Sequence, residues 1–361
     1  MSDVSASTAL AESATPRPLS TLTTLGLGGP PRRLVTATDA DEMVESVREA
    51  DRLHEPTLIL AGGSNVVIGD DGFPGTVVLV RSRGARVLNR DGDTLTVRVE
   101  AGEPWDEFVA STVTAGWSGL ECLSGIPGSA GATPIQNVGA YGQEVAETIV
   151  AVQVYDRFAD EVRTMPAEEC GFAYRTSVFK GNDRWVVLSV DFRLTRSSLS
   201  GPVRYAELAG SLGVEIGERV PLAEAREHVL ALRTRKGMVL DPNDPDTRSV
   251  GSFFTNPVLD AEEYARLRER TGELGDPPAW PQPDGTVKVS AAWLIDQAGF
   301  PKGFRRPGGV AISSKHTLAL THRGGGSTAA LLALAAEIRD GVRERFGVTL
   351  HPEPVLVNCQ L

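Results

Sequence analysis

No charged residue occurs between Glu121 and Glu144, and the same segment is rich in glycine, with glycines at positions 125, 128, 131, 139 and 142. Glycine leaves the backbone bare enough for a ligand to approach it, while Pro127 and Pro134 restrict the path of the chain. Successive backbone N–H groups without bulky neighbours bind a phosphate or the polar edge of a heterocycle. The segment therefore predicts a rigid binding loop for such a ligand.

A flexible linker is the alternative interpretation of this segment. Linkers consist mainly of serine, glycine and charged residues. This segment instead carries apolar side chains that require burial, namely Ile126, Ile135, Val138 and Tyr141. We therefore favour a packed loop.

The composition limits the possible partners. The chain has 361 residues, a formal net charge of -11 and a pI near 5.1, which argues against a nucleic-acid surface or an anionic membrane surface. No segment is long and apolar enough to span a membrane. The three cysteines indicate no disulfide framework, and the five histidines form no metal-binding pair. We expect a cytoplasmic monomer without a metal site.

The length exceeds what one ordinary core can hold, so we expect several domains. The serine- and alanine-rich start lacks the basic and apolar parts of a signal peptide and predicts a disordered tail. Helical and strand patterns alternate without an internal repeat, which indicates an α+β chain. The expected division is a disordered tail at 1–18, a first subdomain at 19–85, a second at 86–236 and a third unit at 237–354, with 355–361 as a candidate addition to the first.

Local signals predict individual elements. Asp39 is expected to cap a helix with Glu42 as its capping-box partner, Gly116 to follow the end of another helix, and Ser290 and Ser327 to begin later ones. Besides these caps, we expect helices at 105–114, 221–236 and 327–346 and strands at 57–60, 76–80, 94–99, 150–155, 185–194, 310–312, 317–321 and 355–357.

Three short segments carry groups that could do chemistry. Arg175 lies among apolar and hydroxyl residues, where a guanidinium can bind a carboxylate through two bonds, although an ordinary salt bridge is slightly favoured from the residues alone. Ser252 precedes two phenylalanines and could be a buried proton donor or a plain strand start; no G-x-S-x-G pattern indicates a hydrolase. Glu353 lies between two prolines, which suits acid–base work or pairing with an arginine, and equally a simple turn.

Taken in order, these segments resemble the UDP-N-acetylenolpyruvoylglucosamine reductase family from about residue 19 to the C-terminus. The discriminating motifs are Tyr174-Arg175-x-Ser177, Arg233-x-x-Lys236, Gly251-Ser-Phe-Phe-x-Asn-Pro257, Trp293-Leu-Ile-Asp-Gln297 and Pro352-Glu353. The N-terminal part is similar to the wider group of vanillyl-alcohol-oxidase-like flavoproteins through 61–65 and 125–142. The resemblance implies an α+β architecture in which a two-domain FAD-binding fold precedes a smaller substrate-binding domain.

The resemblance implies non-covalently bound FAD as the cofactor and NADPH as the hydride donor. The two glycine-rich segments then supply the cofactor contacts. The residues implied to contact FAD are Gly62, Gly63, Ser64, Asn65, Gly125, Ile126, Pro127, Gly128, Ser129, Gly131, Ala132, Gln136, Asn137, Gly139, Ala140 and Tyr141.

The implied reaction is reduction of the enolpyruvyl group of UDP-N-acetylglucosamine enolpyruvate to UDP-N-acetylmuramate in peptidoglycan synthesis. Arg175 and Glu353 are implied to stabilise the enediolate, and Ser252 to donate the proton. Tyr205 indicates the subtype that closes a tyrosine-bearing loop over the substrate, whereas Thr255 stands where relatives often carry lysine. The residues implied to contact the substrate are Tyr205, Lys236, Asn256, Lys288 and Gln297.

Two other functions remain to be weighed against this one. An FAD oxidase of the wider group, acting on an alcohol with oxygen, finds no support in 251–257. A flavin- or nucleotide-sugar-binding protein without turnover would keep the glycine-rich segments but would not need Arg175, Ser252 and Glu353 together. We therefore favour the reductase.

Overall fold

The computed structural model describes residues 17–361, so the tail expected at 1–18 falls almost entirely outside the described residues. The helices are α1 (Ala40–Arg52), α2 (Trp105–Thr114), α3 (Ala206–Leu212), α4 (Leu222–Arg235), α5 (Ala261–Thr271), α6 (Ala291–Gln297) and α7 (Thr328–Phe346). The strands are β1 (Pro31–Ala37), β2 (Thr57–Leu60), β3 (Val66–Ile68), β4 (Phe73–Val80), β5 (Ala85–Asp91), β6 (Thr94–Glu100), β7 (Trp117–Ser118), β8 (Gly139–Ala140), β9 (Gln143–Glu144), β10 (Ile149–Asp156), β11 (Glu161–Pro166), β12 (Trp185–Arg196), β13 (Ser249–Ser252), β14 (Val258–Leu259), β15 (Ala279–Pro281), β16 (Val287–Val289), β17 (Arg305–Arg306), β18 (Val310–Ile312), β19 (Ala319–His322) and β20 (Val355–Val357).

The first sheet has the strand order β1-β4-β2, with both neighbouring pairs parallel. Helix α1 covers it because Met43 and Val47 recur on one face and pack against Val78 and Val80 of β4. Asp39 begins this helix by accepting a hydrogen bond from the Glu42 amide at 2.8 Å. The first unit is thus a small layer of helix on parallel sheet.

The second sheet runs β11-β10-β12-β6-β5, with β7 pairing the far end of β12, and its pairs are antiparallel. Its inner face packs against α2 through three aromatic rings. Trp105 and Phe108 of α2 lie 5.6 and 5.8 Å from Phe192 of β12, measured between ring centroids. Large tilted rings of this kind bury much apolar surface and fix the helix on the sheet.

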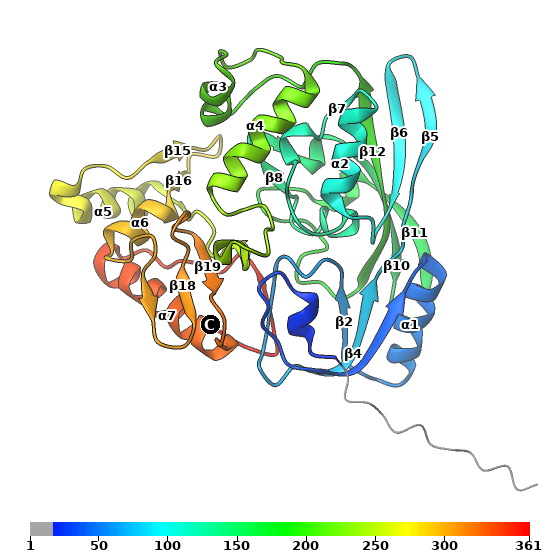
Figure 1. Ribbon diagram of the computed structural model, residues 1–361, viewed down its shortest axis with the longest axis horizontal. Helices are drawn as coiled ribbons and strands as arrows, with labels where there is room; N and C mark the ends of the chain where they lie inside the picture. Colours follow the sequence, from blue (N-terminus) through cyan, green and yellow to red (C-terminus); the bar gives the residue numbers. More distant parts are fainter. Residues whose placement is uncertain (1–16) are drawn as a thin grey trace, which may run out of the picture.

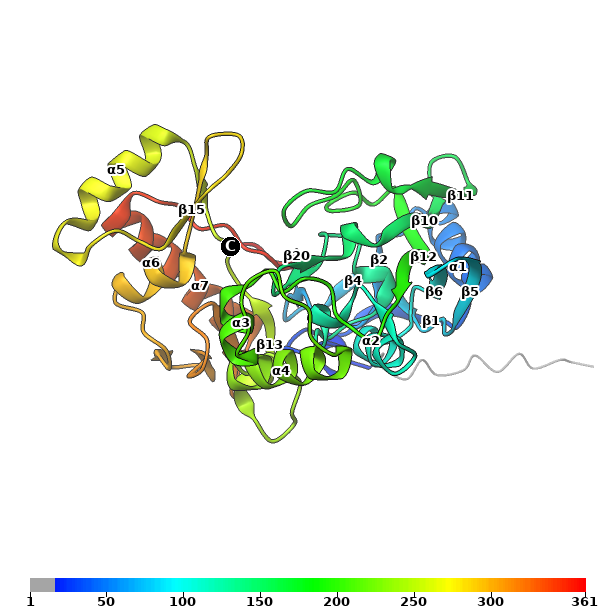
Figure 2. The ribbon, with the colours of Figure 1, turned by 90° about the horizontal axis from the view of Figure 1, so that it is seen from above.

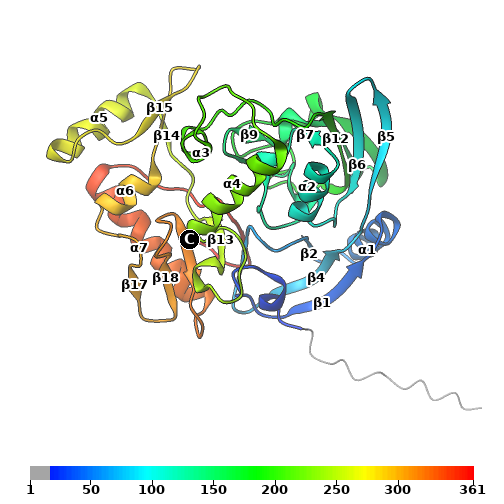
Figure 3. The ribbon, with the colours of Figure 1, turned by 45° about the horizontal axis from the view of Figure 1, so that its top comes forward.

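The third part of the chain packs around a further core, to which Leu25, Leu27 and Val67 of the first part also contribute. Its sheets have the orders β13-β19-β18-β17 and β14-β16-β15, and α5, α6 and α7 surround them. Helix α7 supplies buried residues along its length, from Leu331 to Phe346. Figures 1 and 3 show this smaller part beside the larger one, with α4 along the boundary between them. The expected α+β class is confirmed.

The C-terminal strand returns to the N-terminal part. β20 pairs in parallel with β3, with Val355 opposite Val66 and Val357 opposite Ile68. Figure 2 shows the red end of the chain crossing from the smaller part to the larger one. Asp70 also joins the first part of the chain to the third. Its two carboxylate oxygens accept hydrogen bonds from the amides of Thr328 and Ala329 at the start of α7.

Most expected elements are present, and two expectations need correction. The capping box at α1 is only half formed, because the Glu42 carboxylate accepts the Thr38 amide instead of the Asp39 amide. The strand expected at 317–321 begins at Ala319, because a turn joins the Ala319 amide to the His316 carbonyl. The short helix α3 directly follows Tyr205. Within residues 17–361, none of the helices combines the length and apolarity needed to cross a bilayer.

We expect Asp70→Ala to lower the free energy of unfolding by about 1 kcal/mol, the usual cost of losing a helix cap. The reason is that two amides at the start of α7 lose their acceptor. Urea unfolding followed by circular dichroism measures the change. Asp71→Ala is the matched control, because Asp71 is exposed and makes no hydrogen bond among the described residues; equal midpoints for the two variants would refute the role of Asp70.

Candidate active site

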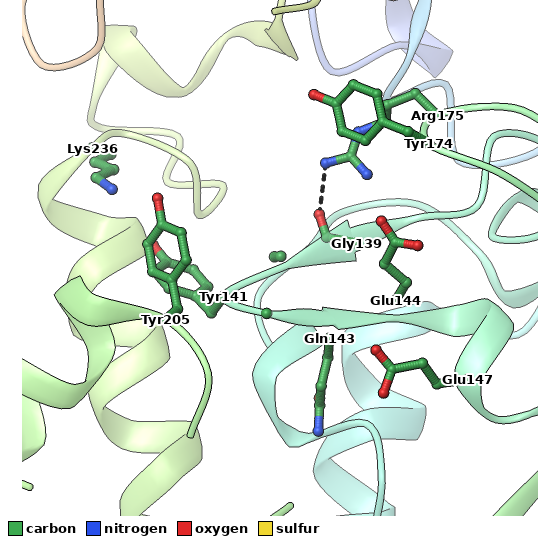
Figure 4. A pocket seen from close by; sticks show the side chains of 11 residues that line it. Gly139, Tyr141, Gln143, Glu144, Glu147, Tyr174, Arg175, Tyr205 and Lys236 are labelled. Atoms are coloured by element: carbon green, nitrogen blue, oxygen red, sulfur yellow. Dashed lines mark hydrogen bonds between the residues drawn. The ribbon is translucent and has the colours of Figure 1, made fainter. Parts of the chain in front are cut away.

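A pocket of about 390 Å³ lies between the β8–β9 hairpin and three segments that are distant in the sequence. Arg175 and Tyr174 stand at one end of it, and Tyr205 and Lys236 stand at the other (Figure 4). The hairpin between them carries Tyr141 and belongs to the uncharged glycine-rich segment. The structure therefore brings a candidate catalytic residue, cofactor residues and substrate residues to one cavity.

Arg175 is held by the backbone of the glycine-rich segment. Its Nη2 donates to the Gly139 carbonyl at 2.8 Å and its Nη1 to the Asn137 carbonyl at 3.4 Å, so the guanidinium plane is fixed. Its φ angle of 52° lies in the left-handed region, which is costly for a residue with a side chain. Such strain persists only where the surroundings hold the residue in place, and it occurs often at functional sites.

Glu353 faces Arg175, with Oε1 3.3 Å from the Arg175 Nε and 3.4 Å from the Gln136 Nε2. Its own amide donates to the Phe253 carbonyl at 2.8 Å, which fixes the start of the side chain. Burial raises the pKa of the Glu353 carboxyl, and the nearby Arg175 lowers it only in part. Glu353 therefore keeps its proton to a higher pH than an exposed glutamate does.

Ser252 is the last residue of β13, directly before Phe253, and is partly buried. The bond between Phe253 and Glu353 places these two segments side by side, and a bridge between Phe254 and Pro352 extends the contact. The three candidate catalytic residues thus come together through one direct contact and one backbone link. Neither Ser252 nor Glu353 lines the pocket described above, which ends at Arg175.

Two of the five substrate candidates meet over Tyr141. The Tyr205 ring lies 5.6 Å from the Tyr141 ring in an edge-on arrangement, and the Lys236 Nζ lies 5.6 Å from the centre of the same ring. Lys236 also pairs with Glu207 of α3 at 2.5 Å. The segment that carries Tyr205 is therefore attached at the end of the pocket where Lys236 lies.

The other substrate candidates divide into two groups. The Lys288 Nζ of β16 lies 4.6 Å from the centre of the Tyr174 ring, and the Arg175 guanidinium carbon lies 5.3 Å from it, so Tyr174 contacts two cations. Asn256 accepts the Ala291 amide at 3.0 Å in the same part of the fold. The described contacts of Gln297 do not join it to the others, because its amide nitrogen lies 3.5 Å from an oxygen of its neighbour Asp296.

Two glycine-rich loops meet so closely that a side chain cannot stand between them. A Cβ added to Gly62 would lie 2.5 Å from the Gly128 Cα, which no real Cβ contact tolerates. The Ser64 hydroxyl donates to the Pro127 carbonyl at 3.1 Å and joins the same loops. Gly131 is equally constrained, since an added Cβ would lie 2.4 Å from the Ala101 Cβ.

The polar groups of these loops fit an anionic cofactor. Within residues 17–361, no hydrogen bond uses the amides of Gly62, Gly63, Ser64 or Asn65, and the buried Ser129 hydroxyl has no partner. Free amides in consecutive residues form an anion-binding concavity. The pyrophosphate of FAD needs such donors together with bare backbone, so the residues present fit this cofactor.

The remaining cofactor candidates have structural contacts of their own. The Gly125 amide donates to Asp106 at 2.5 Å, and Asn137 donates to Glu144 at 2.7 Å. Ile126 packs on the core of the second sheet, and Ala132 ends a short 3₁₀ turn. These contacts hold the segment rigid, as its sequence indicates. Gly139, Ala140 and Tyr141 line the pocket.

Two residues beside the site have no motif that marks them. Lys180 donates to the Arg175 carbonyl at 2.9 Å and supports its strained backbone. The His316 Nε2 lies 3.4 Å from the Ser252 Oγ, although 64 residues separate them in the sequence. Neither spacing follows a helix or strand period, so sequence patterns alone could not have placed these side chains.

Comparison with known proteins identifies the family. The chain is 70% identical over 345 residues to a UDP-N-acetylenolpyruvoylglucosamine reductase from Salinispora arenicola, covering 95% of both chains. The chain belongs to the UDP-N-acetylenolpyruvoylglucosamine reductase family. The reductase of Thermobifida fusca is 59% identical over 348 residues, covering 95% of this chain and 98% of that protein.

Other comparisons agree with membership of the reductase family. Residues 242–357 match the family described as UDP-N-acetylenolpyruvoylglucosamine reductase, C-terminal domain, and residues 31–164 match that described as FAD binding domain. The crystal structure of the reductase from Thermus caldophilus superposes with a TM-score of 0.63 at 25% identity, covering 94% of this chain and 97% of that one. The sequence-based resemblance to this family is therefore confirmed.

We expect Gly62→Ala to weaken FAD retention by roughly tenfold or more, a loss of about 1.4 kcal/mol of binding free energy. The added methyl group would push the loop at Gly62 away from Gly128. The ratio of absorbance at 450 and 280 nm after desalting measures the retained cofactor. Gly210→Ala is the control, because Gly210 lies in α3 with open space around it. If the Gly62→Ala protein retained as much FAD as this control, the two glycine-rich loops would not form the cofactor site.

Proposed function

We propose that the chain catalyses the NADPH-dependent, FAD-mediated reduction of UDP-N-acetylglucosamine enolpyruvate to UDP-N-acetylmuramate in peptidoglycan synthesis, with Arg175, Ser252 and Glu353 as its catalytic residues. The enzyme class is an FAD oxidoreductase, as in its relatives. The observation that carries the assignment of residues is the contact between Arg175 and Glu353 beside Gly139.

Arg175 is suited to hold negative charge on the substrate. FAD, when bound, supplies the hydride that it has received from NADPH. Addition of hydride to the terminal vinyl carbon leaves negative charge that spreads into the neighbouring carboxylate. A guanidinium fixed by two backbone carbonyls needs no rearrangement when this charge develops, which is how preorganised groups lower a barrier.

Glu353 is suited to donate a hydrogen bond to the same charge. Because burial raises the pKa of this carboxyl, its protonated form persists to a higher pH than in an exposed glutamate. A protonated carboxyl donates through its O–H, whereas a carboxylate can only accept. When Glu353 is protonated, Arg175 and Glu353 together offer a cation and a neutral donor at one point.

Ser252 is suited to deliver the proton that completes the reduction. A hydroxyl is a weak acid in water, but a substrate carbanion is a strong base, and an oriented, partly buried hydroxyl meets the requirement for general acid catalysis. The Oγ–H bond breaks as the C–H bond forms. Water then replaces the proton on the serine oxygen.

We further propose that Tyr205 and Lys236 bind the diphosphate end of the substrate, with Asn256, Lys288 and Gln297 as further contacts, and that the chain has the subtype with a tyrosine-bearing loop. The position of Tyr205 in the wall of the pocket, next to Tyr141, supports the loop assignment. A cation in front of a polar pocket is the usual partner of a phosphate.

We propose the domain division of 19–85, 86–236 and 237–354, with 355–361 rejoining the first part, and a monomeric cytoplasmic enzyme. The separate cores around α7 and around β12 support the division, as does the pairing of β20 with β3. A nucleotide-sugar substrate and NADPH are both small metabolites of the cytoplasm, which supports the location.

We expect Ser252→Ala to leave reduction of the flavin by NADPH unchanged and to slow its reoxidation by the enolpyruvyl substrate by about 100-fold or more, the size of a lost general acid. Anaerobic stopped-flow absorbance at 450 nm follows both half-reactions separately. The control is Ser211→Ala, whose hydroxyl contacts His228 and does not line the pocket. Equal losses in both half-reactions would rule out a proton-donor role.

We expect Arg175→Lys to slow reoxidation of the flavin by at least about tenfold, or about 1.4 kcal/mol of barrier. A lysine retains the charge but cannot reach Gly139, Asn137 and Glu353 at once, as the planar guanidinium does. Steady-state kcat and KM together with the stopped-flow rate measure the effect. The comparison variant is Lys180→Arg, which makes the reverse substitution at a residue that contacts Arg175. If Arg175→Lys turned over nearly as fast as the unchanged enzyme, the catalytic role of Arg175 would be contradicted.

A further inference from the structure

Beside Ser252 lies a histidine to which the proposed function gives no role. The His316 Nε2 is 3.4 Å from the Ser252 Oγ, and both side chains are partly buried. His316 belongs to the turn that precedes β19, in which its carbonyl accepts the Ala319 amide at 3.1 Å and its amide donates to the Ser313 hydroxyl at 3.2 Å. Since Ser252 pairs directly with Ala319, the turn places the imidazole beside the serine.

The surroundings of the ring favour its neutral form. Burial lowers the pKa of His316 to about 4, and the cations Lys236, Lys302 and Arg233 act in the same direction. Glu207 of α3 is the one carboxylate among these neighbours, and its effect is the smallest of them. A neutral imidazole carries one N–H and one bare nitrogen, so it can donate to one partner and accept from another.

We propose that His316 is a positioning residue that donates its Nε2–H to the Ser252 Oγ and leaves the serine proton free to point at the substrate. This inference rests on the proposed role of Ser252 as proton donor. When the serine proton passes to the substrate carbanion, whose lone pair forms the new C–H bond, the Oγ is left as an alkoxide. The same N–H then stabilises that alkoxide until a proton from water restores the hydroxyl.

The arrangement accounts for how a serine can act as an acid here. An unsupported alkoxide in a partly buried place is costly, because a charged group loses its hydration there. Hydrogen bonds to charged groups are stronger than those between neutral groups. The hydrogen bond from His316 therefore stabilises the serine oxygen more after proton transfer than before it. A stabilisation that grows in this way lowers the barrier to proton transfer.

The test compares two exchanges of His316. His316→Phe keeps a flat ring and removes the donor, whereas the amide nitrogen of His316→Gln stands near the position of Nε2 and still donates. We expect flavin reoxidation by the enolpyruvyl substrate to slow by about 10- to 100-fold in the phenylalanine variant and to recover most of that loss in the glutamine variant. Flavin reduction by NADPH should be unchanged in both, and His54→Asn, at an exposed loop position, is the control.

A second readout is independent of turnover. In nuclear magnetic resonance spectra of the purified holoenzyme, the ring signals of His316, assigned by their absence in His316→Gln, should not titrate between pH 5.5 and 8.5. The pH profile of the flavin reoxidation rate should accordingly show no change caused by titration of His316 over the same range. A ring that titrates near its ordinary pKa of about 6.5 would overturn the inference.

The outcomes separate this inference from the proposed function. If Ser252→Ala leaves reoxidation intact, the proton-donor role itself fails. If Ser252→Ala slows reoxidation while His316→Phe does not, the serine acts alone and the inference about His316 is wrong. If the glutamine variant is as slow as the phenylalanine variant while both retain FAD and NADPH reduction, the histidine contributes shape instead of a hydrogen bond, and the inference is likewise overturned.

Discussion

The pairing of β20 with β3 is the constraint on which the site depends. Glu353 precedes this strand by two residues, and β3 directly follows the loop that ends at Asn65. The Val355 amide donates to the Asn65 carbonyl at 3.0 Å, so the end of the chain is fixed to the glycine-rich loop. A carboxyl group from the C-terminal part thereby reaches Arg175 of the middle part, although nothing in the sequence brings them close.

Rigid backbone is the second requirement of this site. The guanidinium of Arg175 points at two carbonyls of the glycine-rich segment, and that segment is itself held by Asp106, Glu144 and the aromatic core. Charged side chains thus come from outside a segment that has none. The uncharged segment and the candidate catalytic charges are therefore each fixed by their own contacts.

Much of this could be predicted from the sequence, because local signals decide it. The caps Ser290 and Ser327 and the end of α7 at Gly347 follow from side-chain hydrogen bonds and from a left-handed glycine, which act within one turn. The strand β3 was missed because three apolar residues after a glycine turn have no distinguishing period, and the partner strand lies at the other end of the chain.

The site was predicted less completely, for the same physical reason. The motifs around Arg175, Ser252 and Glu353 marked the catalytic candidates through a family resemblance, whereas their mutual distances follow from strand pairing. No local pattern in the sequence marks His316, because its contact with Ser252 depends on the register between β13 and β19. Contacts set by register are invisible until both strands are placed.

The late position of β20 also orders the assembly of the molecule in time. Synthesis proceeds from the N-terminus and domains fold as they emerge, so the parallel sheet with α1 and the antiparallel sheet can form while the last strand is still unmade. The glycine-rich loops therefore exist before Glu353 does. A nascent chain can therefore form both glycine-rich loops before it holds the carboxyl that we propose acts on the substrate.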